Sequence, residues 1–160
     1  MKNFILICLF IIQFSYYSKD KIDIIVVKKS ERVLYAIKDD KVIKKYNIAL
    51  GKNPNGHKKV EGDKKTPEGY YFIDGKNAKS KFFLSLHTSY PNFHDKQIAL
   101  KNKVNPGEHI AIHGLPPLNL LAQYLFDGAD WTDGCIALNN SDMKELWDLT
   151  EEGTQILIRP

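Results

Sequence analysis

One cysteine outside the apolar run at the N-terminus lies in the stretch DWTDGCIALNN, residues 130–140. Cys135 follows a glycine, and the upstream stretch IAIHGLPP places His113 directly before another glycine. A thiol attacks as the thiolate, and with a pKa of about 8.5 only a few per cent of it is ionised at neutral pH. A neighbouring imidazole can take the proton or hold the thiolate as an ion pair. The two residues therefore predict nucleophilic catalysis. The alternative is that they are unrelated buried residues, because most free cysteines behave as small buried hydrophobic residues.

The residues beside this pair suit an acyl-transfer site. Gly134 lets the backbone approach a substrate closely and can turn amide N–H groups toward an oxyanion that develops at the attacked carbonyl. Gly114 ends a predicted strand, where the side chain of His113 can face a cleft. Thr132 is in the same turn as the cysteine and is a candidate for a hydrogen bond to the site. Tyr90, before a proline, either lines the substrate groove or ends a strand.

A metal site is the competing interpretation of the histidines. His109 lies four residues before His113, so in a strand both side chains are on one face. Ile110, however, stands where a metalloprotease helix would need a glutamate. We therefore expect no metal, and we expect His109 to be a supporting or surface residue.

The overall composition excludes some classes of partner. The chain has 160 residues, enough for one domain with a real core, and a net charge of +4 that comes almost wholly from lysines spread along it. Only Arg32 and Arg159 are arginines, so a base-reading or phosphate-clamping surface for nucleic acid is not expected. The positive charge suits the anionic surroundings of a cell envelope.

The N-terminus predicts export. Residues 1–18 combine Lys2 with an unbroken apolar run, as in a secretory signal, and the run is too short to span a bilayer comfortably. Tyr16 and Tyr17 spoil a small-x-small cleavage pattern, so an uncleaved membrane anchor is the alternative. We expect the protein in the periplasm or cell envelope. Exported proteins that use cysteine structurally carry it in pairs, so the single thiol of Cys135 calls for a functional reason.

The remaining chain, residues 19–160, predicts one mainly β domain. Runs rich in Ile, Val and Tyr predict strands, and residues 51–69, dense in Gly, Pro, Asn and Lys, predict a long loop. Leucines at helical spacing predict a short helix over 116–126, and a second helix is predicted over 139–153. The expected fold is an antiparallel β-sandwich with two short helices. The predicted strands are 21–29, 32–38, 41–50, 70–73, 82–87, 108–114, 135–138 and 154–160.

Four ordered motifs resemble the L,D-transpeptidase catalytic domain family. IHG followed by TDGCIALNN is similar to that family's catalytic signature, in which a histidine-glycine pair precedes Ser/Thr-His-Gly-Cys. The stretches EGDKKTPEGYYFI, LHTSYPN and GTQILI resemble its Gly-Asp-x-x-Thr-Pro-Glu-Gly segment, its Ser-Tyr-Pro-Asn segment and its closing strand. Together the motifs cover residues 22–160 in the family's order.

The resemblance implies a β-sandwich enzyme that acts on peptidoglycan. In that family a cysteine attacks the peptide bond after meso-diaminopimelate in a stem peptide and forms an acyl-enzyme. By position, Cys135 is the nucleophile, His113 the base, and the carbonyl of Gly114 the group that orients the imidazole. The N–H groups of Gly134 and Cys135 would form the oxyanion hole. No metal or organic cofactor is implied.

Two departures from the family's pattern affect the expected reaction. Asp133 replaces the usual histidine before Gly-Cys, and Ala137 replaces a common arginine that would suit a substrate carboxylate. The WTDGCIAL form is more similar to a branch that includes a murein L,D-endopeptidase. We therefore favour an L,D-peptidase. The alternatives are a transpeptidase that forms 3-3 crosslinks or attaches protein to peptidoglycan, a non-catalytic envelope-binding module, and a general thiol protease.

Overall fold

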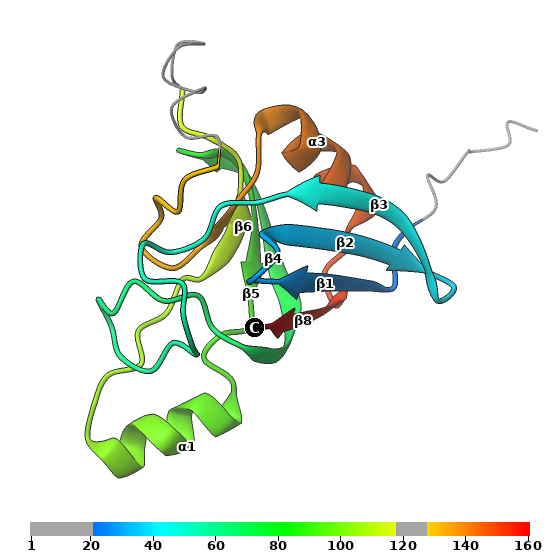
Figure 1. The fold of residues 1–160 in the computed structure, drawn as a ribbon. Coiled ribbons are helices and arrows are strands. Elements are labelled where there is room, and N and C mark those ends of the chain that lie inside the picture. Colours follow the sequence, from blue (N-terminus) through cyan, green and yellow to red (C-terminus); the bar gives the residue numbers. More distant parts are fainter. Residues whose placement is uncertain (1–20, 118–127) are drawn as a thin grey trace, which may run out of the picture.

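The computed structural model describes residues 21–117 and 128–160, which form a mainly β domain (Figure 1). Its strands are hydrogen-bonded in the order β3-β2-β1-β8-β4-β5-β6-β7. Chain segments distant in sequence thus become neighbours, because β8 from the C-terminus inserts between β1 and β4. The strands are β1 (Ile24–Lys28), β2 (Val33–Lys38), β3 (Lys41–Asn47), β4 (Gly69–Ser80), β5 (Phe83–Thr88), β6 (Ala111–His113), β7 (Ile136–Ala137) and β8 (Gln155–Arg159).

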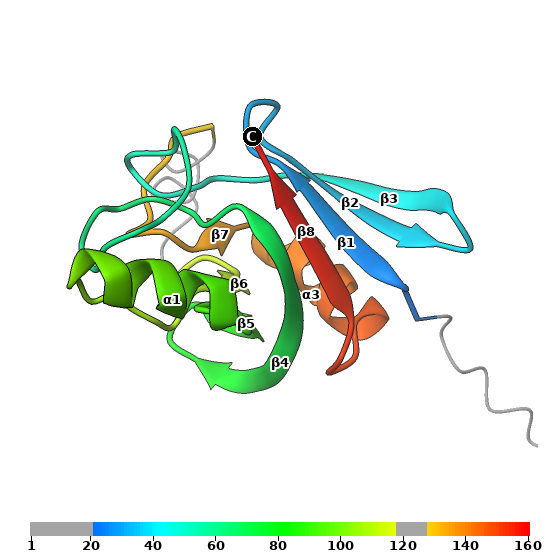
Figure 2. The ribbon, with the colours of Figure 1, turned by 90° about the horizontal axis from the view of Figure 1, so that it is seen from below.

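Strand β4 is long enough to belong to both layers of the sandwich. Its first residues pair with β8, from Gly69 opposite Ile158, and its later residues pair with β5, from Ile73 opposite Thr88. The register shifts between Ile73 and Gly75, and irregularities of this kind bend a strand. Figure 2 shows β4 curling from the side of β8 to the side of β5. The sheet is therefore folded over on itself.

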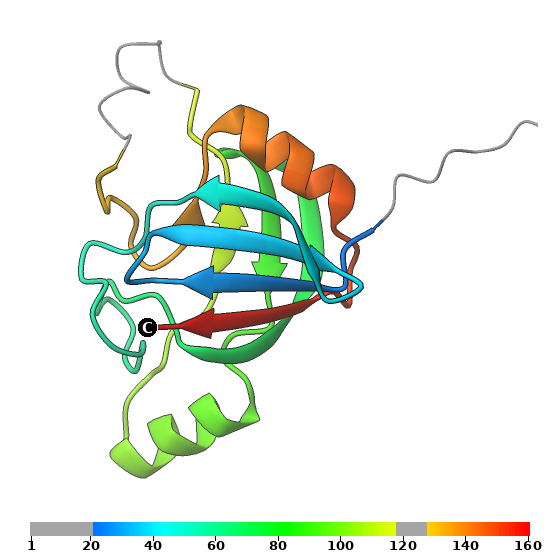
Figure 3. The same ribbon diagram turned by 45° about the vertical axis from the view of Figure 1, so that its right-hand side comes forward.

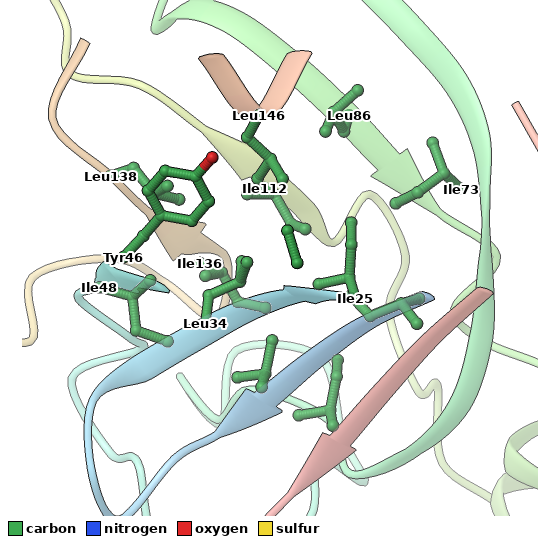
Figure 4. Close-up of a cluster of buried hydrophobic side chains, with 14 of the residues drawn as sticks. Ile25, Leu34, Tyr46, Ile48, Ile73, Leu86, Ile112, Ile136, Leu138 and Leu146 are labelled. Atoms are coloured by element: carbon green, nitrogen blue, oxygen red, sulfur yellow. The ribbon is translucent and has the colours of Figure 1, made fainter. Parts of the chain in front are cut away.

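Apolar side chains from both layers meet in the space between them (Figure 4). Because side chains alternate along a strand, one face of each strand supplies the core and the other face is left for solvent or for a site. The fully buried members of this core include Ile25, Leu34, Ile73, Leu86, Ile112, Ile136 and Leu146.

The mainly β sandwich is confirmed, but the expectation of a purely antiparallel sheet is wrong. Strands β1 and β8 are parallel, and so are β6 and β7. Consecutive strand runs in a sequence indicate hairpins, whereas a parallel pair joins segments that need a long connection. That pairing is therefore not visible in local sequence patterns.

Two helices pack on opposite sides of the sandwich, with α3 (Asn140–Leu149) along one side and α1 (Phe93–Asn102) on the other (Figure 3). Helix α3 was predicted; its N-cap is Asn139, and three of its apolar residues enter the core. Helix α1 was not anticipated, because few of its residues are apolar and only Asp95 and Ala99 are buried. The helix predicted over 116–126 lies, from residue 118 onward, outside the described residues. So does the N-terminal segment, residues 1–18.

Helix α1 is fixed to the body through the buried carboxylate of Asp95. Asn92 and Asp95 form a capping box, in which each side chain accepts a hydrogen bond from the other's backbone N–H. The same carboxylate accepts from the hydroxyl of Tyr71 at 3.0 Å and contacts Nε2 of His57 at 3.2 Å. The start of the helix is therefore held rigidly. Within residues 21–117 and 128–160, no helix is long and apolar enough to cross a membrane.

A buried ammonium group fixes the loop over residues 51–69 to the end of β1. Nζ of Lys29 donates to the carbonyl oxygens of Gly56 and Thr66 and to Oε1 of Glu68, each at 2.8 Å. Burial lowers the pKa of Lys29, and the hydrogen bond that its ammonium group donates to Glu68 opposes that effect. All three donors of the ammonium group have partners, so a buried charge is tolerated here.

We expect Lys29→Met to lower the free energy of unfolding by about 3 kcal/mol, because the loop carbonyls and Glu68 lose their buried partner. Urea unfolding followed by circular dichroism measures the change. The matched control is Lys28→Met. Lys28 pairs with Glu31 at the exposed surface, so its loss should cost under about 0.5 kcal/mol. Equal losses in the two variants would contradict the role assigned to Lys29.

Candidate active site

The register of β6 and β7 places the candidate nucleophile and base on one face. Ile112 pairs with Ile136, and His113 pairs with Ala137. Both isoleucines are fully buried in the core, so the alternate residues His113 and Cys135 face the other way. Because neighbouring strands are about 4.8 Å apart with about 3.3 Å per residue, the register puts their Cα atoms roughly 8 Å apart.

The imidazole of His113 is fixed by its own backbone neighbour and by two aromatic rings. Its Nδ1 lies 2.7 Å from the carbonyl oxygen of Gly114, and a carbonyl only accepts, so Nδ1 carries the proton. Phe82 stacks on the ring at a centroid distance of 4.5 Å, and Trp131 packs edge-on at 5.7 Å. In the neutral ring Nε2 is therefore the basic nitrogen. Burial lowers the pKa of His113, although the hydrogen bond to Gly114 opposes this.

The thiol of Cys135 lies against the backbone of the chain entering β6. Its Sγ is 3.6 Å from the carbonyl oxygen of His109. Burial raises the pKa of the thiol. The nearby N–H of Ala111 and the charge of Lys58 lower that pKa, and the charge of Asp133 adds to the rise. A thiol with a raised pKa beside an imidazole with a lowered pKa is a neutral pair at neutral pH. Of the two possibilities open from the sequence, proton transfer during attack is favoured over a resting ion pair.

The turn that carries the cysteine is organised around the hydroxyl of Thr132. Oγ1 donates to the carbonyl of Cys135 at 2.7 Å and accepts from the N–H of Gly134 at 3.1 Å. The Thr132 backbone pairs with Leu50 and Lys52. Gly134 has a φ of +132°, and a Cβ there would lie 2.7 Å from the carbonyl oxygen of Lys65, so a side chain does not fit. Thr132 thus shapes the turn, and in this conformation it binds the amide of Gly134.

Asp130 is a site-positioning residue that the sequence analysis missed. Its carboxylate accepts from Nε and Nη2 of Arg32, the latter at 2.7 Å, and from the N–H of Leu50 at 2.9 Å. A two-nitrogen arginine–carboxylate contact is among the stronger and more directional polar interactions. It joins the start of the cysteine turn to the start of β2. The sequence feature that could have indicated Asp130 is an acidic residue directly beside the cysteine motif, in a chain with only two arginines as partners for a carboxylate.

Gly114 allows close packing at the end of β6. A Cβ on Gly114 would lie 2.5 Å from Oδ1 of Asn140, the oxygen that accepts the N–H of Leu115 at 2.8 Å. The start of α3 therefore packs directly on the backbone that orients His113. A larger residue at position 114 would displace either the start of α3 or the backbone that orients His113.

The segment EGDKKTPEG forms a frame beside the cysteine turn. Burial alone would raise the pKa of Asp63, but hydrogen bonds from the N–H groups of Lys59, Val60 and Lys65 and from Nζ of Lys58 lower it to about 2. The carboxylate is thus ionised and gathers the loop around itself. It also holds the buried ammonium group of Lys58, whose charge acts on the cysteine.

The other candidate residues are placed differently from this central pair. The hydroxyl of Tyr90 donates to the carbonyl of Pro106 at 2.9 Å, and its ring is part of the core. The side chain of His109 is exposed and pairs with Glu108, while its backbone carbonyl faces the thiol. Within the two described ranges, no group of three His, Cys, Asp or Glu side chains is arranged to hold a metal ion.

The whole described domain matches a known family. The profile described as YkuD, the L,D-transpeptidase catalytic domain, matches residues 22–158. The chain belongs to this family. A search of curated protein sequences gave no match.

Solved structures of L,D-transpeptidase-like proteins share the fold. The helical cell shape determining protein Pgp2 from Campylobacter jejuni is 28% identical over 88% of this chain and 48% of that chain, with a TM-score of 0.63. Bd1075 from Bdellovibrio bacteriovorus gives the same three percentages with a TM-score of 0.60. An L,D-transpeptidase from Xylanimonas cellulosilytica is 15% identical over 88% of this chain and 61% of that one, with a TM-score of 0.57. The chain therefore spans about half the length of the first two proteins.

The L,D-transpeptidase domain accommodates its two departures from the family pattern without strain. The side chain of Asp133 is mostly exposed and pairs with Nζ of Lys52 at 3.5 Å. Ala137 is buried, bridges Ala49 and lies opposite His113 in the register. An arginine at position 137 would have to displace that packing. The surroundings of the thiol are thus less cationic than the family pattern implies.

We expect Thr132→Val to lower kcat/KM of the L,D-transpeptidase domain by about tenfold or more, because the carbonyl of Cys135 and the N–H of Gly134 lose a buried partner. Thr132→Ser keeps the hydroxyl and is the matched control. Steady-state release of the C-terminal amino acid from a tetrapeptide measures the effect. Equal rates for the valine and serine variants would remove the hydroxyl from the positioning of the nucleophile.

Alkylation should report the neutral thiol directly. Because the pKa of Cys135 is raised, its reaction with iodoacetamide should be slow at pH 7 and rise continuously above pH 9. Mass spectrometry of the peptide containing Cys135 gives the rate at each pH, with glutathione as the reference thiol. A fast plateau near neutral pH that falls only on acidification would instead indicate a resting thiolate–imidazolium pair.

Proposed function

We propose that this chain is an exported, cysteine-dependent L,D-peptidase that cleaves peptidoglycan stem peptides at the meso-diaminopimelate carbonyl. The observation that carries the proposal is the placement of Cys135 and His113 on one face, with Nδ1 of the imidazole bound to Gly114 and Nε2 left as the base. The family match supports action on peptidoglycan. The name of one neighbour, a helical cell shape determining protein, supports a role in wall remodelling.

The proposed reaction has two halves that share one acyl-enzyme. Nε2 of His113 takes the thiol proton as Sγ attacks the carbonyl carbon, and the oxyanion accepts a hydrogen bond from the N–H of Cys135. The N–H of Gly134 joins this oxyanion hole only by leaving Thr132. The tetrahedral intermediate collapses as the leaving amine takes the proton from the imidazolium. Water, deprotonated by His113, then attacks the thioester, and the carboxylic acid and free thiol are released.

Hydrolysis is proposed over crosslinking because of what surrounds the thiol. An amine acceptor must be bound and oriented to compete with the water that surrounds the site, and orientation accounts for a large share of such rates. Position 133 carries an exposed carboxylate and position 137 a buried methyl group, so neither of these two residues offers a cation to an anionic acceptor stem. The family's description as transpeptidases keeps the formation of 3-3 crosslinks, or the attachment of protein to peptidoglycan, as the second candidate.

We expect Cys135→Ser to lower the release of the terminal amino acid from tetrapeptide muropeptides by at least about a thousandfold, because an alcohol is a far weaker nucleophile without a base tuned for it. The urea midpoint should be unchanged, which separates chemistry from folding. Mass spectrometry of muropeptides measures the products. Activity in the serine variant comparable to the parent would remove Cys135 from the mechanism and favour a non-catalytic binding module.

The same assay determines whether water or an amine attacks the acyl-enzyme. A purified crosslinked dimer and, separately, a tetrapeptide with excess acceptor are given to the parent protein. The peptidase proposal expects monomers from the dimer and the shortened stem from the tetrapeptide. New 3-3 crosslinks together with an intact dimer would establish the transpeptidase.

A further inference from the structure

A polar cavity of about 280 Å³ lies near the cysteine, although Cys135 itself does not line it. It lies where β5 leads toward α1 and the chain enters β6, and its lining includes Asp74, His87, Lys96, Glu108 and His109. His109 connects the cavity to the nucleophile, because its carbonyl oxygen is 3.6 Å from Sγ of Cys135. The cavity is smaller than a drug-sized pocket, which suits a single small end group.

The sheet register gives a second connection between the cavity and the thiol. His87 pairs with Ala111 across β5 and β6, and the N–H of Ala111 lies at the thiol of Cys135. The three residues therefore form a row across the sheet, and the middle one carries only a methyl group. At about 4.8 Å per strand, His87 is roughly 10 Å from Cys135 between Cα atoms. A long substrate side chain on the residue whose carbonyl is attacked could therefore extend to the cavity.

Both signs of charge line this cavity. Lys96 is exposed, and its backbone N–H bonds to the carbonyl of Asn92 in the first turn of α1. Its neighbour Asp95 is the buried anchor of that helix, so the base of the lysine is held in place. Asp74 is exposed on β4 at the register shift. Within residues 21–117 and 128–160, neither Lys96 nor Asp74 has a side-chain ion pair or hydrogen bond, whereas Glu108 pairs with His109.

A cavity with an uncommitted cation and an uncommitted carboxylate is complementary to a zwitterion. A lone carboxylate would use only Lys96, and a lone amine would use only Asp74. An ammonium and a carboxylate group on one carbon engage both, and wrong pairings would be repelled by like charge.

We propose that this cavity is the specificity subsite for the zwitterionic amino-acid end of the substrate's side chain, with Lys96 binding its carboxylate and Asp74 its ammonium group. The inference rests on the proposed function, because meso-diaminopimelate carries such an end on the residue whose carbonyl is attacked. Four carbon–carbon bonds separate that end from the Cα of the attacked residue, a span of roughly 5 Å. This span lies within the roughly 10 Å between the Cα atoms of Cys135 and His87, a residue that lines the cavity.

The test removes charges from the substrate and from the protein, separately and together, and compares the activities. One tetrapeptide carries the free distal carboxylate of meso-diaminopimelate, a second carries it as the amide, and a third has the distal amine acetylated. The parent protein should prefer the first over either modified peptide by about tenfold in kcat/KM. Lys96→Gln should lose about tenfold on the first peptide and almost nothing on the amide. Asp74→Asn should lose about tenfold on the first peptide and almost nothing on the acetylated one.

A matched variant controls for changes elsewhere on the helix. Lys101, in the exposed last turn of α1, is outside the cavity, and Lys101→Gln should keep the parent's preferences. If Lys96→Gln weakens the free and amidated peptides equally, or neither of them, the cavity does not bind the distal carboxylate and the inference is wrong. The same holds for Asp74→Asn with the free and acetylated peptides.

Binding separates this inference from the proposed reaction. The Cys135→Ser protein, with and without each cavity substitution, is titrated calorimetrically with the same three peptides. The preferences expected in kcat/KM should appear in Kd. If the parent releases no amino acid but the Kd pattern holds, the proposed peptidase is wrong and the subsite stands. If turnover is found but neither Kd nor kcat/KM depends on the cavity charges, the subsite alone is wrong. If none of the three peptides binds, the proposed subsite is also wrong.

Discussion

The parallel pairing of the two-residue strand β7 with β6 is the constraint on which the site depends. Ile136 enters the core opposite Ile112, and alternation then forces Cys135 and Ala137 to the outer face, where His113 lies. A shift of one residue in this register would bury the thiol in the core and expose an isoleucine. Burial of Ile136 in a close-packed interior opposes that shift. The packing of one side chain on one face therefore determines the chemistry available on the other.

So short a strand needs support from its other edge, and the chain supplies it from a distant segment. Ala137 and Ala49 exchange two backbone hydrogen bonds in an antiparallel bridge. Thr132 forms a parallel bridge with Gly51, through backbone hydrogen bonds to the residues on either side of it. Asp130 adds a charged contact to Arg32 at the start of β2. The cysteine turn is thus held between the two layers of the sandwich, and its position depends on the whole sheet order. This explains why a loop as polar as residues 51–69 is anchored by buried lysines and by Asp63.

Much of this arrangement could be predicted from the sequence. Alternating apolar runs and turn residues gave most strands, and the spacing of apolar residues gave α3. Cys135, His113 and the two glycines were singled out by their types and neighbours. Other features depend on contacts between distant segments: the parallel pairs, the bend in β4, and the contact of Asp130 with Arg32. Helix α1 was missed because its stability comes from a capping box and from Asp95 bound to Tyr71, and neither gives an apolar periodicity.

The electrostatics of the site follow from this packing and bear on why a single thiol is tolerated. Burial shifts the pKa of Cys135 upward and that of His113 downward, so both shifts favour the uncharged forms. Oxidation and disulfide exchange require the thiolate, and a neutral thiol resists both. In the oxidising compartment that we propose, such a cysteine would persist in the free protein. It becomes nucleophilic when a bound carbonyl accepts its electrons as Nε2 of His113 accepts its proton, so that reactivity is coupled to occupancy of the site.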